Sequence, residues 1–210
     1  MMRRRGTVSV LAALLSVSTL AACGGGPDAL DEAGAKEALL TQDEFPLDGY
    51  TRGTVTTGVQ AAGEYDPASA PDTSEECRAA LEEFSSIDHT EFLSSSASVR
   101  FDAGEDSSLE LQVAGVTQEP EKLVDVTHEL GTCGEVTRSE GGLEMTTTFE
   151  AFENDDVRGV MMRQDVQGNV VEAWMGGRAA GDNLVYAFGT GVTQDELAEV
   201  VDEQVSKIED

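Results

Sequence analysis

Basic residues are scarce in this sequence. Its 210 residues include 13 lysines and arginines against 41 acidic residues, which gives a formal net charge of −28. Lys36, Lys122 and Lys207 are the only lysines. Binding to nucleic acid or to anionic lipid headgroups would bring like charges together, so the composition argues against both partners. Two simpler explanations of the acidic composition remain: a hydrated surface that keeps the protein soluble, and adaptation to a saline habitat.

Histidines and aromatic residues are also few, which restricts the available chemistry. His89 and His128 are the two imidazoles, and neither falls in a catalytic motif. The sequence lacks the Gly-x-Ser-x-Gly, Ser-x-x-Lys and His-Glu-x-x-His patterns of common hydrolases. Aromatic residues make up 5% of the chain, which gives poor support for a stacking platform for sugars or bases. We therefore predict no enzymatic activity and no catalytic residue.

Acidic residues cluster in two predicted turns, but without the spacing of a calcium loop. One cluster contains Asp102, Glu105 and Asp106, and the other spans residues 153–156. Hard cations need several oxygens that converge on one point. Neither turn has the Asp-x-Asp-x-Asp-Gly pattern, and solvated turns explain both clusters. We predict no metal site and no cofactor.

A leader-like segment occupies the N-terminus. Three arginines at positions 3–5 precede an apolar run over residues 8–20, which is too short to span a bilayer comfortably. The run ends in Leu-Ala-Ala-Cys at positions 20–23, which resembles the lipobox of bacterial lipoproteins. That resemblance implies a cleaved signal peptide over residues 1–22 and acylation of the Cys23 thiol. The alternative is an ordinary signal peptide followed by a chance cysteine.

The proposed acylation of Cys23 determines the roles left for the other cysteines. An acylated Cys23 would anchor an exported protein to the outer face of the cytoplasmic membrane. Cys77 and Cys133 then remain, and an exported compartment permits a disulfide between them. Two buried free thiols are the alternative.

The rest of the chain predicts one domain that mixes helices and strands. We predict a flexible tether at residues 23–36, reaching roughly 20 Å, and a single α+β domain at residues 37–210. Apolar residues recur at helical spacing after Cys77, and a capping box at Thr193 and Glu196 opens a last helix. Alternating residues between Gly- and Asn-rich turns indicate an antiparallel sheet. The predicted fold is a sheet of about six to seven strands with two to three helices packed mainly on one face.

Several short motifs keep a characteristic order between about Leu39 and Ile208. They are Leu39-Leu40-Thr41, Phe45-Pro46, Gly49-Tyr50, Cys77 at the opening of a helix, Leu130-Gly131-Thr132-Cys133 and Asn183-Leu184-Val185-Tyr186. In this order the chain resembles the extracellular sensor domain of PknH-type receptor kinases and its lipoprotein relatives in actinobacteria. The resemblance implies a sheet with helices on one side, an open cleft and usually two disulfides. Cys77 and Cys133 match the first disulfide, and the second has no counterpart here.

The function predicted from the sequence is that of a lipid-anchored, non-enzymatic binding or sensor-like lipoprotein. Its partner would be a small ligand or an envelope protein, bound in a cleft between sheet and helices. Trp174, Met161 and Met175, with Met162, are the candidates for lining such a pocket, although residues at this strand spacing more often belong to an ordinary core. The alternative function is that of a structural or accessory envelope lipoprotein that contacts a cationic protein through its acidic surface.

Overall fold

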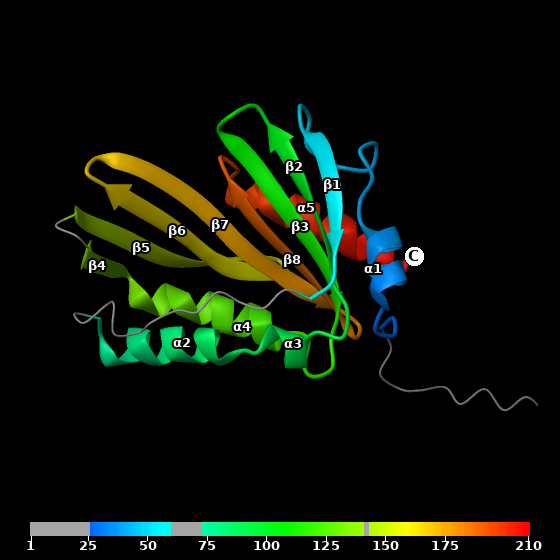
Figure 1. The fold of residues 1–210 in the computed structure, drawn as a ribbon, viewed down its shortest axis with the longest axis horizontal. Helices are drawn as coiled ribbons and strands as arrows, with labels where there is room; N and C mark the ends of the chain where they lie inside the picture. Colours follow the sequence, from blue (N-terminus) through cyan, green and yellow to red (C-terminus); the bar gives the residue numbers. More distant parts are fainter. Residues whose placement is uncertain (1–25, 60–72, 141–142) are drawn as a thin grey trace, which may run out of the picture.

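The fold is built on one continuous antiparallel sheet. The computed structural model describes residues 26–59, 73–140 and 143–210. Eight strands pair in the order β1-β2-β3-β8-β7-β6-β5-β4 (Figure 1). Their bounds are β1 Thr51–Thr57, β2 Ala97–Ala103, β3 Ser107–Gly115, β4 Glu135–Glu140, β5 Leu143–Asn154, β6 Val157–Val166, β7 Asn169–Ala180 and β8 Asn183–Thr190. The predicted α+β class is confirmed, with eight strands instead of the six to seven that the sequence indicates.

In the described part of the chain, five α-helices and one 3₁₀ helix accompany the sheet. They are α1 Glu32–Ala38, α2 Glu75–Ser86, α3 His89–Phe92, α4 Lys122–Glu129, the 3₁₀ helix η2 Leu130–Cys133 and α5 Gln194–Glu209. The capping box predicted at the start of the last helix is present, because Thr193 and Glu196 bond each other's backbone N–H groups. Within the three described stretches, no helix combines the length and apolar character that a bilayer crossing requires.

The helices cover both faces of the sheet, so the prediction of helices mainly on one face is wrong. Successive side chains of a strand point to opposite faces. On β8, Val185 and Ala187 join the apolar cluster that contains α5, whereas Leu184 and Tyr186 pack with the cluster that contains α4. We call these two sides the α5 face and the α4 face. Helix α1 joins α5 on the first, and α2 lies beside α4 and η2 on the second.

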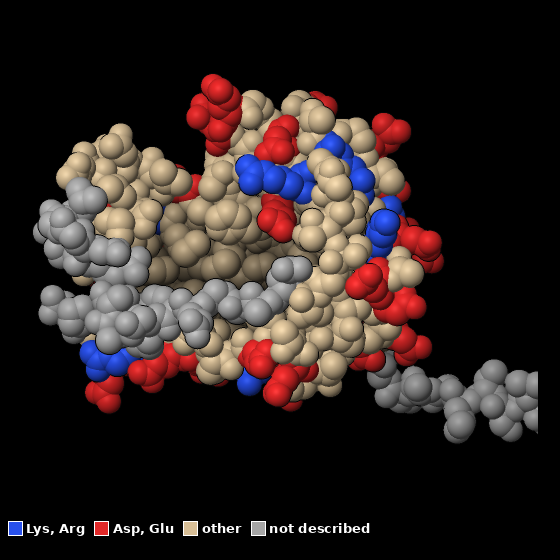
Figure 2. All heavy atoms as spheres, in the orientation of Figure 1, with Lys and Arg blue, Asp and Glu red and all other residues tan. Residues whose placement is uncertain are grey.

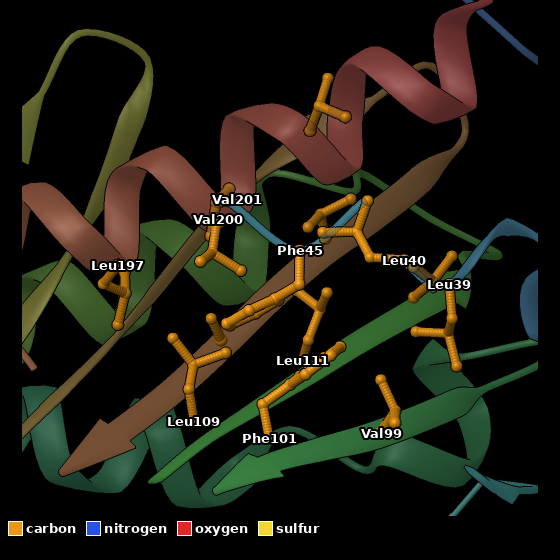
Figure 3. Close-up of a cluster of buried hydrophobic side chains, with 14 of the residues drawn as sticks. Leu39, Leu40, Phe45, Val99, Phe101, Leu109, Leu111, Leu197, Val200 and Val201 are labelled. Carbon is orange, nitrogen blue, oxygen red and sulfur yellow. The ribbon is translucent and has the colours of Figure 1, made fainter. Parts of the chain in front are cut away.

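The main core lies on the α5 face (Figure 3). Leu109 and Leu111 of β3 and Phe101 of β2 are fully buried there, facing apolar residues of α5. Phe45 stacks on Phe101 with ring centroids 3.8 Å apart, so the segment after α1 completes this core. The contact also holds the N-terminal part of the chain on the sheet.

Part of the predicted tether is folded. Helix α1 starts at Glu32, inside residues 23–36, and its Ala35 is fully buried. After α1, Thr41 and Glu44 lie in a turn that α5 reaches. The Lys207 ammonium donates to the Glu44 carboxylate at 2.6 Å, and the Thr41 N–H donates to it at 2.8 Å. These hydrogen bonds hold the pKa of Glu44 at about 2. The folded domain therefore begins before the boundary at residue 37.

Candidate ligand site

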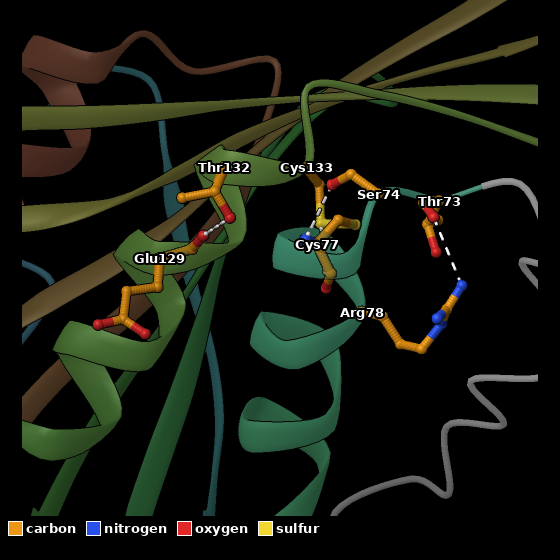
Figure 4. The surroundings of a disulfide bond; sticks show 7 residues. All are labelled: Thr73, Ser74, Cys77, Arg78, Glu129, Thr132 and Cys133. Atoms are coloured by element: carbon orange, nitrogen blue, oxygen red, sulfur yellow. Dashed lines mark hydrogen bonds between the residues drawn. A yellow bond between two sulfur atoms is a disulfide. The ribbon is translucent and has the colours of Figure 1, made fainter.

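A disulfide fixes helix α2 beside the sheet. Cys77 and Cys133 are joined with an S–S distance of 2.04 Å, which confirms the predicted pair (Figure 4). Ser74 caps α2, and its hydroxyl accepts from the Cys77 N–H at 3.1 Å. The buried Cys77 and Leu81 pack with Leu130 at the start of η2. The bond thus ties α2 to the one-turn helix that itself rests on β5.

A hollow opens on the α4 face of the sheet. Figure 2 shows it in the orientation of Figure 1, and its visible floor is formed almost entirely by uncharged residues. Acidic and basic side chains gather on the surrounding surface. In a chain with 41 acidic residues, a floor with so few charged side chains is an exception that suits an apolar or uncharged occupant.

The sheet side of this hollow is apolar. Strand register places Met175 of β7 opposite Phe188 of β8, and Met162 of β6 opposite Ala173 of β7. Paired residues share one face of a sheet, and Met162 and Met175 pack against the α2–η2 cluster. Phe188 keeps 40% of its surface exposed. An aromatic ring beside flexible thioether side chains is a surface that adapts to varied apolar ligands.

Tyr186 closes the inner end of the apolar surface as a neutral phenol. Its hydroxyl lies 2.9 Å from the Thr127 hydroxyl, which donates its own hydrogen to the Leu123 carbonyl at 2.7 Å. Tyr186 is therefore the donor in the pair. Burial raises its pKa well above the ordinary value of 10. At physiological pH this side chain orients α4 on the sheet and does not exchange a proton.

Towards β3 and β2 the same face becomes polar. Register places Gln112 opposite Tyr186 and Glu110 opposite Phe188. Arg100 lies opposite Glu110 on β2 and pairs with Asp102 at 2.6 Å. The arginine charge is thus already balanced, and this edge offers hydrogen-bonding groups without an excess of positive charge.

The predicted pocket residues do not share a site. Trp174 alternates with Met175 along β7 and lies opposite Met161, on the α5 face. There the Trp174 ring meets the Phe152 ring edge-on, with centroids 5.3 Å apart, as part of the core. Of the three candidates, Met175 is the one on the hollow side. Sequence reasoning missed Tyr186 and Phe188, which the period of two along β8 after the buried Leu184 would have revealed.

The remaining titratable clusters do not form a reaction centre. His89 begins α3, and its partial burial lowers its pKa while the neighbouring Asp88 opposes the shift. Among the described residues, no three His, Cys, Asp or Glu side chains converge in a way that holds a metal ion. A polar recess of 320 Å³ lies between α4 and the β5–β6 turn. Its arginines Arg158 and Arg178 are paired with Asp125 at 2.6 Å and Asp202 at 2.8 Å, so it holds no unpaired cation for an anion.

Comparison with known proteins supports the fold. No family model matches the chain, and no curated protein matches it. Among solved structures, the extracellular domain of PknH from Mycobacterium tuberculosis is similar, with a TM-score of 0.59 and 12% identity. The match covers 86% of this chain and 97% of that one. A putative uncharacterized protein from Mycobacterium smegmatis matches with a TM-score of 0.49 and 9% identity, over 78% of this chain and 90% of that one. The match to the PknH extracellular domain confirms the predicted resemblance for the fold.

Proposed function

We propose that this protein is a lipid-anchored, non-enzymatic, sensor-like binding protein outside the cytoplasmic membrane, and that its ligand occupies the hollow on the α4 face. The observation that carries the proposal is the uncharged floor of that hollow in a strongly acidic protein. Similarity to the PknH extracellular domain supports an extracytoplasmic sensor fold. The lipobox-like residues at positions 20–23 support the anchor.

The ligand that fits this hollow is apolar or uncharged. Phe188, Met175 and Met162 offer apolar surface. At its edge Gln112 offers its amide oxygen as an acceptor, because its side-chain nitrogen already donates to the Ser96 hydroxyl at 2.7 Å. A net charge of −28 disfavours anions throughout the surrounding space. Nucleotides and anionic lipids are therefore poor ligands, and a neutral amphipathic molecule is the best candidate.

Loss of the anchor is the first test. In cells that express the full chain, Cys23→Ala should move the protein from the membrane pellet to the soluble fraction and abolish incorporation of labelled palmitate. The physical reason is that the thiol is the attachment point of the lipid, without which an acidic domain has little affinity for a bilayer. Gly25→Ala, which keeps Cys23, is the control and should fractionate as the unaltered protein does. A Cys23→Ala protein that still pellets with membranes would contradict the anchor.

A charge placed in the hollow is the second test. Phe188→Asp should weaken the binding of Nile red, an uncharged apolar dye whose fluorescence rises on binding, at least about fivefold. The reason is that an unpaired carboxylate beside an apolar ligand costs about 1 kcal/mol or more. Val170→Asp is a matched control: Val170 is 44% exposed, comparable to Phe188 at 40%, but alternation along β7 puts it on the α5 face. Equal dye signals from both variants would argue against the hollow and favour the accessory role based on the acidic surface.

A further inference from the structure

The first described residues of the chain are fastened to the end of the sheet. The Asp182 N–H donates to the Pro27 carbonyl at 2.9 Å. Asn183 accepts from the Leu30 N–H at 2.8 Å and donates to the Asp28 carbonyl at 3.0 Å. These bonds join residues 27–30 to the turn between β7 and β8, more than 150 positions away in the sequence.

The junction between residues 26–30 and the β7–β8 turn depends on particular residues at its contact points. Asn183 is fully buried, so its amide satisfies backbone groups that would otherwise be buried without partners. Gly181 has φ of 59°, in the region that favours glycine, and a methyl group on it would overlap the backbone of Gly26 and Pro27. Gly26 in turn lies so close to Gly181 that it tolerates no side chain there. The chain is therefore held from Gly26 onwards.

A very short spacer separates this junction from Cys23. Between the Cα atoms of Cys23 and Gly26 there are three peptide steps, which reach at most about 11 Å when fully extended. The sequence alone predicts a tether of 14 residues, but the structure leaves Gly24 and Gly25 as the residues between Cys23 and the junction. A folded body on so short a spacer cannot move away from its anchor.

We infer that the end of the sheet formed by the β7–β8 turn and residues 26–30 faces the lipid bilayer, with the hollow open to the aqueous side. The inference rests on the proposed acylation of Cys23. Strand β7 runs from Asn169 to Ala180 towards this end, so its start lies up to about 37 Å away from it along the strand. Asp28 and Asp182 are exposed at the bilayer end, so the covalent spacer, and not charge attraction, holds it there.

The orientation decides from which side a ligand arrives. The outer part of β7 is exposed, including Val170 and Val171, and the hollow lies on the α4 face of the sheet. Phe188 is five residues beyond Asn183 on β8, about 17 Å from the bilayer end. A ligand therefore enters from the aqueous compartment, and a lipid diffusing within the bilayer does not reach Phe188 directly.

Energy transfer to the bilayer tests the orientation. The lipid-modified full chain carries a donor dye at either Asp182→Cys, at the inner end, or Asn169→Cys, at the outer end; both side chains are exposed. Each protein is bound to phosphatidylcholine vesicles that contain rhodamine-labelled headgroups. We expect transfer efficiency from position 182 to exceed that from position 169 more than about twofold, because about 37 Å of strand separates them. Insertion of twelve Gly and Ser residues between Gly24 and Gly25 should remove most of the difference.

The outcomes separate the orientation from the anchor. Flotation of the protein with vesicles, measured on the same samples, reports the anchor alone. A protein that floats but transfers energy equally from both positions overturns the orientation and leaves the proposed anchor in place. A difference that survives the twelve-residue insertion supports the orientation but overturns the short spacer as its cause. A protein that does not float overturns the anchor, and the inference with it.

Discussion

Replacing Cys77 and Cys133 together by alanine is expected to lower the free energy of unfolding by about 4 kcal/mol. The disulfide closes a loop with a sequence separation of 56 residues. In the chain-entropy model, release of such a loop gives the unfolded chain about 4 kcal/mol of additional conformational freedom. This is a large share of the stability of an ordinary domain. Urea unfolding followed by the fluorescence of Trp174 measures the change.

The same substitution should loosen α2 more than the rest of the fold. Helix α2 contacts mainly η2 and α4, its buried side chains share an apolar cluster with Val160 of β6, and the disulfide is its covalent link to η2. Without the bridge, its amphipathic face retains modest contacts through Leu81 and Phe84. Amide hydrogen exchange should accelerate in residues 75–86 before it changes in β8. Because Met162 and Met175 pack against the apolar cluster of α2 and η2, Nile red binding should weaken in parallel.

Thr132→Ala provides the control for the disulfide. Thr132 is next to Cys133, but its exposed hydroxyl donates locally to the Glu129 carbonyl at 2.8 Å and does not reach α2 (Figure 4). Its removal should change the free energy of unfolding by no more than about 1 kcal/mol. Reduced, unaltered protein should resemble the double alanine variant. If the double variant unfolds at the original urea concentration and α2 stays protected, the proposed role of the bridge is wrong.

The local elements of this fold follow closely from the sequence, and their arrangement does not. The apolar spacing after Cys77 predicts α2, and the Thr193–Glu196 pair predicts the start of α5, because both signals depend on neighbouring residues. The face on which a strand residue lies depends on what covers each side. In β7, Trp174 and Met175 are both apolar because helices cover both faces of the sheet. Hydrophobicity alone therefore cannot assign one of them to the hollow.

Long-range polar contacts explain why the tether is misjudged from sequence. Residues 23–36 lack an apolar pattern, yet Asn183 and Ser95 bond the backbone near Leu30. Such contacts depend on strands that come together only in the folded protein, so no local sequence motif predicts them. The PknH-type resemblance predicts a shared fold and an open cleft, whereas the position of this domain relative to its anchor depends on the particular residues of its own N-terminal segment.

Gln204→Leu is expected to destabilise the domain by about 2–6 kcal/mol. Gln204 is fully buried on α5, although it is polar. Its side-chain oxygen accepts from the Leu40 N–H at 2.9 Å, and its side-chain nitrogen donates to the Ala38 carbonyl at 2.7 Å. Leucine has similar volume but neither hydrogen-bonding group. Each backbone group left buried without a partner costs about 1–3 kcal/mol.

The expected damage concentrates where the N-terminal segment meets the core. Leu39 and Leu40 are almost completely buried between α5 and the strands of the α5 face, and the amide of Gln204 sets their position (Figure 3). Urea unfolding gives the total loss, and hydrogen exchange at the Leu40 amide reports the local bond. Gln194→Leu is the matched control, because Gln194 lies at the first turn of the same helix and makes one exposed bond, to the Glu153 carbonyl at 3.2 Å. That variant should stay within about 0.5 kcal/mol of the unaltered protein. A Gln204→Leu protein that is equally stable, with its Leu40 amide still protected, would mean that apolar packing alone seats the N-terminal segment.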